Sequence, residues 1–301
     1  MTKKITSIIL AALLAFTTLA LTACGGSDSS SSSSSDSDTA SGNDVTIAIP
    51  NDPTNEARAL MLLDANGYIK LKDGASITAT IQDVEDANGI TFQEIEAAQI
   101  PNTLQDVDFG IINSNYAIDA GLNPVEDSLL IEGSAADYAN IIAVKEGNEN
   151  TDKTKALVAA VTSQKVVDFI EEEYQGAIVS VITDPTDGYD DTVDYDALAG
   201  QTITVAASPT PHAEILAVAK EILAEKNVTL EILEFTDYVQ PNNVVESGEV
   251  DANYFQHLPY LEDFNEENGT HIVSVAAVHN EPMGLYAGKT TTLDGVKKLS
   301  E

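Results

Sequence analysis

Two stretches of the chain repeat one pattern of apolar and polar positions: a short apolar run, a proline-containing loop and an apolar helical face. In the first stretch the run covers residues 45–49, Asp52 can cap a helix, and residues 59–63 are apolar enough to be buried. In the second, the run covers residues 202–206, and apolar residues at helical spacing follow Pro211. Each stretch is therefore predicted to be a strand, a loop and the open N-terminus of a helix.

Short apolar runs and amphipathic segments alternate along the rest of the chain. The runs predict strands and the amphipathic segments predict helices. The predicted strands include 90–95, 109–112, 141–144, 228–235 and 272–275, and the predicted helices include 102–105, 153–161, 165–174, 260–266 and 293–299. Because helices alternate with short strands, the pattern favours parallel sheets in an α/β fold.

The composition changes to Asp, Thr, Gly and Pro over residues 183–201. Such a segment has little to bury and is predicted to be an exposed linker. The strand, loop and helix pattern restarts directly after it. Two such units suit two lobes that point helix N-termini into one cleft.

The first residues have the layout of a secretory signal. Lys3 and Lys4 precede an apolar run, 5–21, and small residues lead to Cys24, the only cysteine. We predict a signal peptide over 1–23, with Cys24 as the lipidated N-terminus of the mature chain and 24–43 as a flexible tether rich in Ser, Asp and Gly. The protein is then anchored to the cell membrane by lipid and faces the outside of the cytoplasmic membrane. An ordinary signal peptide with an incidental cysteine is the alternative.

The chain is strongly acidic, with a formal net charge of -35 at pH 7. This charge argues against nucleic acid or anionic lipid surfaces as partners. Most of the carboxylates are expected to be a solvated surface that favours solubility. Residues 184–191 faintly resemble a calcium loop but lack the remaining spacing, so they stay part of the predicted linker.

Arg58 is the only arginine in the sequence, three residues after Asn55 at the start of the first predicted helix. Both side chains lie on one face of that helix, beside unpaired N–H groups that attract anions. A guanidinium is always charged and can grip a carboxylate through two parallel hydrogen bonds. Arg58 is therefore a candidate clamp for a ligand carboxylate. A surface arginine paired with one of the many acids is the alternative.

Several longer phrases together resemble one family, the methionine-binding lipoproteins of the NlpA type, which are substrate-binding subunits of ATP-driven amino-acid importers. The matching phrases are Ile49–Asn55, Leu71–Gly74, Phe235–Asn242, Phe255–His257 and Glu281–Gly284. The resemblance implies a two-lobe periplasmic-binding-protein-like α/β fold with a ligand cleft between the lobes.

The order of the segments departs from the family, in which those at 202–301 precede those at 44–182. The chain is therefore similar to a circular permutant, in which residues 183–201 join the family's usual ends and residue 301 comes near the strand at Val45. Lobe A is then expected over 44–137 plus 287–301, and lobe B over 138–286 with the linker inside it.

The resemblance also implies a binding site, carried over residue by residue. Arg58 would hold the ligand carboxylate, and Asn113 and Asn140 would fix the other polar groups of the amino acid backbone. The thioether would lie against an aromatic wall made by Tyr238, Phe255 and His257. Without the resemblance, a Tyr and a Phe in such lobes are more often core residues.

The implied function is capture of methionine by a monomer and its delivery to a membrane permease with an ATPase subunit. No catalytic residue, cofactor or metal-ligand set is predicted. Another amino acid, a methionine-containing peptide, a divalent metal or a role as a surface adhesin are the alternatives. An enzyme is disfavoured because no nucleophile motif appears. A metal site would use the four histidines, although they lack tight spacing in the sequence: His212, His257, His271 and His279.

Overall fold

The structure is a computed structural model that describes residues 43–133 and 138–299. The predicted signal peptide, Cys24 and nearly all of the predicted tether lie outside the described residues. Within them, no helix is long and apolar enough to cross a bilayer.

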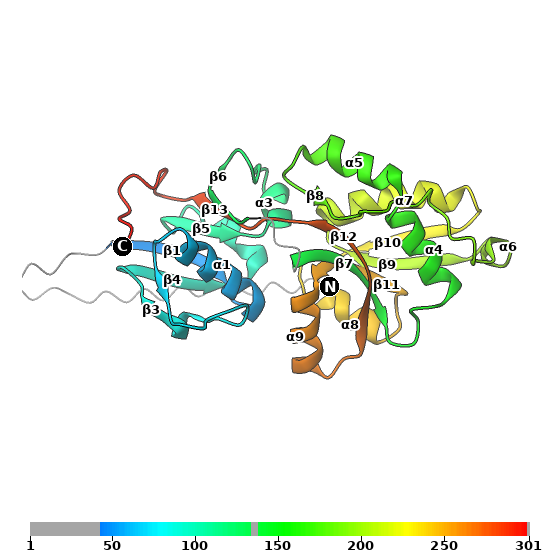
Figure 1. The fold of residues 1–301 in the computed structure, drawn as a ribbon, viewed down its shortest axis with the longest axis horizontal. Coiled ribbons are helices and arrows are strands. Elements are labelled where there is room, and N and C mark those ends of the chain that lie inside the picture. Colours follow the sequence, from blue (N-terminus) through cyan, green and yellow to red (C-terminus); the bar gives the residue numbers. More distant parts are fainter. Residues whose placement is uncertain (1–42, 134–137, 300–301) are drawn as a thin grey trace, which may run out of the picture. The chain divides into compact units, whose positions relative to one another are not determined.

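A five-stranded sheet carries the first strand-to-helix unit (Figure 1). Its strands, in spatial order, are β4 (Ile90–Ile95), β1 (Val45–Pro50), β5 (Phe109–Ile112), β13 (Gly284–Ala287) and β6 (Ser128–Ile131). Strand β1 is parallel to β4 and β5, whereas β13 is antiparallel to β5 and β6. The four residues of β5 are all buried, because α1 (Pro53–Ala65) covers one face and α2 (Ile100–Thr103) and α3 (Ser114–Asp119) cover the other.

A six-stranded sheet carries the second unit. Its order is β10 (Thr229–Glu234), β9 (Thr202–Ala207), β11 (Ala252–His257), β7 (Ala139–Lys145), β12 (Ile272–Asn280) and β8 (Val179–Ser180). The first three strands are parallel, and β7, β12 and β8 join by antiparallel pairing. Both sheets are thus mixed: they contain the expected parallel strands, and they also contain antiparallel strands that the sequence did not predict. The strands at which the chain crosses from one sheet to the other, β7, β12 and β13, pair antiparallel with their neighbours.

Alternate residues of β7 enter two cores. Ile142 and Val144 pack on the face covered by α4 (Asp152–Val161), α5 (Gln164–Tyr174) and α7 (Glu214–Ala224). Ile141 and Ala143 pack on the opposite face, with α8 (Gln240–Glu246) and α9 (Leu258–Asn268). A strand buried on both sides needs apolar residues throughout, which explains the continuous apolar run in the sequence.

Two passages of the chain lead from one sheet to the other. Strand β6 is followed by β7, and β12 is followed by β13 through Glu281–Met283 (Figure 1). Polar residues in the second passage, such as Glu281, therefore lie between a strand of each sheet.

The segment 183–201 is not the fully exposed linker that its composition predicts. It contains a short helix, α6 (Tyr195–Leu198), and the side chains of Val193 and Leu198 are buried in the core of the six-stranded sheet. Its few apolar residues are enough to anchor it, which a compositional average does not reveal.

Residues 293–299 do not form the predicted helix, and a turn ends in an extended stretch instead. The Asn43 side chain donates to the Lys297 carbonyl at 2.8 Å and accepts from the Lys297 N–H at 2.6 Å, while the Leu299 N–H donates to the Gly67 carbonyl. These backbone groups bond to other segments and are unavailable to a helix. The expected closeness of this stretch to the start of β1 is confirmed.

Gly288 provides a test of how this last stretch packs. A Cβ there would lie 2.4 Å from the Val107 carbonyl oxygen and 2.5 Å from that of Leu104, and a backbone cannot yield as a flexible side chain can. We expect Gly288→Ala to lower the free energy of unfolding by about 1–3 kcal/mol in urea titrations. Gly295→Ala, at an exposed glycine with open space around it, is the matched control and should be nearly neutral. Equal stability of the two variants would contradict this packing.

Candidate ligand-binding site

One pocket collects all six residues predicted to contact a ligand. Its cavity volume is about 20 Å³, room for about one water molecule, so a larger ligand requires the side chains or the sheets around it to move apart. Arg58, Asn113, Asn140, Tyr238, Phe255 and His257 all line it, together with Asn55, Ser114, Asn115, Gln256, Tyr260 and Glu281. The structure thus brings the predicted set together, and its role in binding stays a prediction.

Strand ends and helix starts position these side chains. The carboxyl ends of parallel strands in both sheets lead into the pocket, the usual place for a site in an α/β fold. After β1, the Asp52 carboxylate caps α1 by accepting from the Asn55 N–H at 3.0 Å, and it also accepts from the Asn55 amide at 2.8 Å. At the end of β11, the ring of His257 caps α9 by accepting from the Tyr260 N–H at 3.2 Å.

The guanidinium of Arg58 is buried and already holds a carboxylate. Its Nε and Nη2 donate to the two oxygens of Glu132 at 3.2 and 2.6 Å, and Nη2 also donates to the Glu281 carbonyl at 3.0 Å. The Tyr138 ring lies 4.5 Å from the guanidinium carbon. Burial alone would lower the pKa of Arg58, but the facing Glu132 carboxylate raises it. The expected carboxylate clamp is therefore occupied along one edge by a residue that the sequence did not single out.

The other edge of the guanidinium is weakly held. Among the residues that the structure describes, Nη1 donates only to the Asn55 amide oxygen, at 3.3 Å. The same oxygen accepts from the Asn113 amide at 2.9 Å and faces the His257 Nε2 at 3.4 Å. Asn55 therefore joins three of the predicted site residues. The Nη1 edge is the part of Arg58 best placed to receive a further acceptor.

Two amide atoms on the pocket wall have unused hydrogen-bonding capacity. Within residues 43–133 and 138–299, no group bonds to Asn113 Oδ1 or to Asn115 Nδ2, although both atoms are buried. One is an acceptor and the other a donor. A buried polar atom without a partner costs free energy unless a ligand or water supplies the bond. The pair suits a ligand that carries both a donor and an acceptor.

Aromatic rings form the opposite wall. The Tyr238 ring centroid lies 5.9 Å from that of Phe255 and 5.8 Å from that of Tyr260, and the Tyr238 hydroxyl donates to Asn115 Oδ1 at 2.7 Å. The His257 ring packs edge-on against Tyr138, with centroids 5.3 Å apart. Burial and the nearby Arg58 charge hold the pKa of His257 well below its ordinary value, so its ring is neutral. This wall is apolar, polarisable and uncharged.

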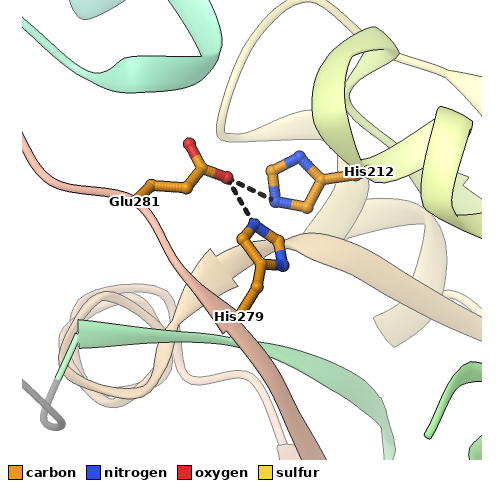
Figure 2. A group of neighbouring side chains, drawn as sticks. All are labelled: His212, His279 and Glu281. Atoms are coloured by element: carbon orange, nitrogen blue, oxygen red, sulfur yellow. Dashed lines mark hydrogen bonds and ion pairs between the residues drawn. The ribbon is translucent and has the colours of Figure 1, made fainter. Parts of the chain in front are cut away.

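A second cluster of buried titratable groups lies behind this pocket (Figure 2). Glu281 Oε1 lies 3.2 Å from Nε2 of His212, on the turn before α7, and 2.8 Å from Nε2 of His279, on β12. His212 Nε2 also lies 2.9 Å from Asn140 Oδ1, and Glu281 Oε2 accepts from the Asn115 N–H at 3.0 Å. The cluster thus contacts the predicted site through Asn140.

Burial controls the charges of this cluster. It lowers the pKa of both imidazoles to about 3 and raises the pKa of Glu281. The structure brings together only two of the four histidines considered as metal ligands, since His257 lies in the pocket wall and His271 is exposed. His212 and His279 are 67 positions apart, so no local spacing could have revealed the pair.

The two sheets with a pocket lined from both define the class: a two-lobe α/β binding protein, as expected. The family model described as NlpA lipoprotein matches residues 34–182 and 203–301. The chain therefore belongs to the NlpA lipoprotein family.

Relatives match over part of this chain. Membrane lipoprotein TpN32 of Treponema pallidum is 42% identical over 135 residues, which is 44% of this chain and 50% of the relative. The D-methionine-binding lipoprotein MetQ of Escherichia coli K12 is 37% identical over 136 residues, with the same shares of 44% and 50%. The chain spans about half the length of the curated relatives it matches.

Solved structures give a similar partial match. A nutrient binding protein from Burkholderia cenocepacia bound to methionine is 41% identical, with a TM-score of 0.43, over 45% of this chain and 58% of that one. A lipoprotein from Ruminococcus gnavus is 44% identical, with a TM-score of 0.44, over 46% and 59%.

The neutral state of His257 predicts a pH dependence of stability. Above its ordinary pKa of 6.5 the ring is neutral in both states; below it, the unfolded chain takes up a proton that the folded chain excludes. Acidification from pH 6 to 5 should therefore destabilise the wild type more than His257→Gln, by up to about 1.4 kcal/mol per pH unit.

Urea unfolding at each pH gives the free energy of unfolding, and its slope against pH is compared between the wild type and His257→Gln. His271→Gln, which removes an exposed imidazole, is the control and should retain the wild-type slope. If His257→Gln also retains it, the ring of His257 is not held neutral.

Proposed function

We propose that this protein captures methionine in the pocket between its two sheets. The proposal rests on three features that line one pocket. They are the Nη1 edge of Arg58, two amide atoms with unused hydrogen-bonding capacity, and an aromatic wall. A relative was solved with methionine bound, and others are named D-methionine-binding lipoproteins. These names support methionine as the ligand of this chain.

The polar end of the ligand would lie among the asparagines. Its carboxylate would accept from Arg58 Nη1 and Asn115 Nδ2, and its ammonium would donate to Asn113 Oδ1. A charge pair some 4 Å apart contributes about 4 kcal/mol at an effective dielectric near 20. Asn140, which His212 orients, would complete this set.

The thioether would lie against Tyr238, Phe255 and His257. Each contact between sulfur and an aromatic ring is worth about 0.3–1.5 kcal/mol. A charged side chain would lose its hydration at this wall and find no partner there. The aromatic wall therefore favours a ligand whose side chain is apolar and polarisable.

Glu132 makes the pocket selective for the net charge of the ligand. Because it neutralises Arg58 inside the protein, a ligand with a net negative charge would meet an already balanced pair. A zwitterion, which carries no net charge, fits this balance. The pocket is therefore suited to neutral amino acids rather than to glutamate or aspartate.

Delivery to a membrane permease with an ATPase subunit follows as the transport role. Membership of a lipoprotein family supports anchoring at the membrane, with Cys24 as the proposed lipidated residue and the folded part on the outer side of the cytoplasmic membrane. A monomer that opens and closes at the two passages between the sheets, near Tyr138 and Tyr286, would release and capture the ligand. We propose a binding protein and not an enzyme. Another amino acid or a short methionine peptide is the nearest alternative, and an adhesin the more distant one.

We also propose that the segment order is a circular permutation of the family's usual order. The family model matches in two blocks that are interrupted between residues 182 and 203. The bonds between Asn43 and Lys297 support a chain that could be joined there. The lobes would then be residues 44–137 with 287–301, and residues 138–286, except that β13 pairs within the five-stranded sheet, so the boundary moves from residue 286 to before Gly284.

Arg58 carries the first test of the ligand. Arg58→Ala should weaken methionine binding by about two orders of magnitude, roughly 3 kcal/mol, because the ligand carboxylate is left buried without a cation. Arg58→Lys should recover little, because an ammonium cannot reproduce the planar fork. Calorimetric titration of chain lacking residues 1–40 measures both.

Lys153→Ala is the control, since it removes a cation paired with Asp251 at 3.1 Å outside the pocket. The unfolding transition of each variant checks that it is folded. Loss of less than about threefold in either arginine variant would exclude Arg58 from the site.

Reordering the chain tests the permutation. A gene that places residues 183–299 before 44–182, with a short flexible join in place of the Asn43 to Lys297 contact, keeps the buried Val193 and Leu198 and should give a folded protein with unchanged methionine affinity. The control inserts the same flexible join into the middle of β7. Because β7 is a buried strand, this insertion should prevent folding. Failure of the reordered chain to fold would contradict the proposal.

A further inference from the structure

The buried cluster of His212, His279 and Glu281 gathers two imidazole nitrogens around one carboxylate oxygen. A neutral imidazole has one N–H donor and one nitrogen acceptor. If His212 carries its proton on Nε2, its Nδ1 must accept a hydrogen bond, yet among the described residues Nδ1 has no partner. If the proton is on Nδ1, the Nε2 lone pair is free to bind a cation.

The second tautomer leaves the Nε2 lone pair facing two oxygens. Glu281 Oε1 lies 3.2 Å away and Asn140 Oδ1 lies 2.9 Å away. Three lone pairs that converge in a buried space repel one another unless a proton or a metal cation lies between them. The geometry of His212 therefore favours a cation at this point.

The second histidine completes a set of ligand atoms. His279 Nε2 lies 2.8 Å from the same Glu281 oxygen, and the ligand atoms of the three residues all lie within 4.8 Å of one another. The His279 Nδ1 is hydrogen-bonded to the Tyr254 hydroxyl, the kind of outer partner that orients a metal-bound imidazole. Figure 2 shows both rings pointing a nitrogen at one carboxylate oxygen.

We propose that His212, His279 and Glu281 bind a divalent first-row transition ion, such as Zn²⁺, through two imidazole nitrogens and one carboxylate oxygen. Asn140 Oδ1 or water supplies the fourth position. Donor atoms around a tetrahedral zinc ion lie roughly 3.3 Å apart. The two nitrogen-to-oxygen distances, 3.2 and 2.8 Å, therefore need only a small expansion. Two imidazoles exclude Ca²⁺ and Mg²⁺, which prefer oxygen donors.

The ion can reach this site from the pocket. Glu281 and Asn140 line the pocket as well as the cluster. The formal charge of -35 raises the concentration of cations around the protein. The proposal does not rest on methionine as the ligand, because none of its three ligands needs the amino acid.

Metal titration of the full chain, stripped by a chelator and free of amino acids, tests the site. We expect one Zn²⁺ to bind per chain, and Co²⁺ to give the visible absorption of an imidazole-bound ion. His212→Gln, His279→Gln and Glu281→Gln should each lose at least about tenfold in Zn²⁺ affinity. His271→Gln, at an exposed histidine, should bind as the wild type does.

Thermal unfolding keeps the test independent of folding defects. Each variant is first melted without metal, and Zn²⁺ should then raise the Tm of the wild type and of His271→Gln only. Ca²⁺ is the control for weak binding of cations to the acidic surface, and it should raise the Tm of neither protein. Absence of the Co²⁺ absorption in the wild type, or Zn²⁺ affinity retained in His279→Gln, would overturn the proposal and leave a cluster held by protons. Either result leaves the methionine titration unaffected.

Discussion

A guanidinium that is buried and cannot lose its proton sets the requirements for the centre of this protein. The Arg58 side chain is only 3% exposed. Burying an unpaired charge costs several kcal/mol, so the fold must bring a carboxylate and polar acceptors to it. Glu132 supplies the charge, and Asn55 and the Glu281 carbonyl supply further acceptors. Three separate parts of the chain must therefore meet at one point before the pocket can exist.

Glu281 is the residue through which this requirement extends to the second sheet. Its carbonyl accepts from Arg58, while its carboxylate contacts His279 and His212 and accepts from the Asn115 N–H. It lies on the passage from β12 to β13, where the chain leaves one sheet for the other. A change in the relation between the sheets must therefore alter the bonds of Glu281. The carboxylate that holds the cluster also belongs to the part of the chain that moves if the lobes open.

The sequence predicted the local parts of this arrangement better than the long-range ones. The runs at 90–95 and 109–112 are the strands β4 and β5, and Asp52 caps α1, because periodicity and capping depend on neighbouring residues. The six site residues met in one pocket as a family resemblance implied. Glu132 could not be found this way: it is one of 49 acidic residues and lies 74 positions from Arg58.

The wrong helix at 293–299 has the same cause. Its apolar residues, Leu293 and Val296, have helical spacing, but they pack into the core of the five-stranded sheet from a turn. The bonds that fix this stretch come from Asn43 and Gly67, more than 200 positions away. Tertiary bonds therefore replaced the local ones that a helix would have used.

The same dependence on distant contacts bears on the proposed permutation of the segments. The bonds of Arg58 join residues 74 and 223 positions apart, and those of His257 reach Asn55 from 202 positions away. The free energy of closing a loop changes only slowly with its length, by about 0.6 kcal/mol per doubling. Moving a block of the chain from one end to the other changes many loop lengths by such factors, but it leaves the donor, acceptor and charge at the pocket unchanged. A site built from contacts across the whole chain is therefore constrained by which segments are present more than by the order in which they occur.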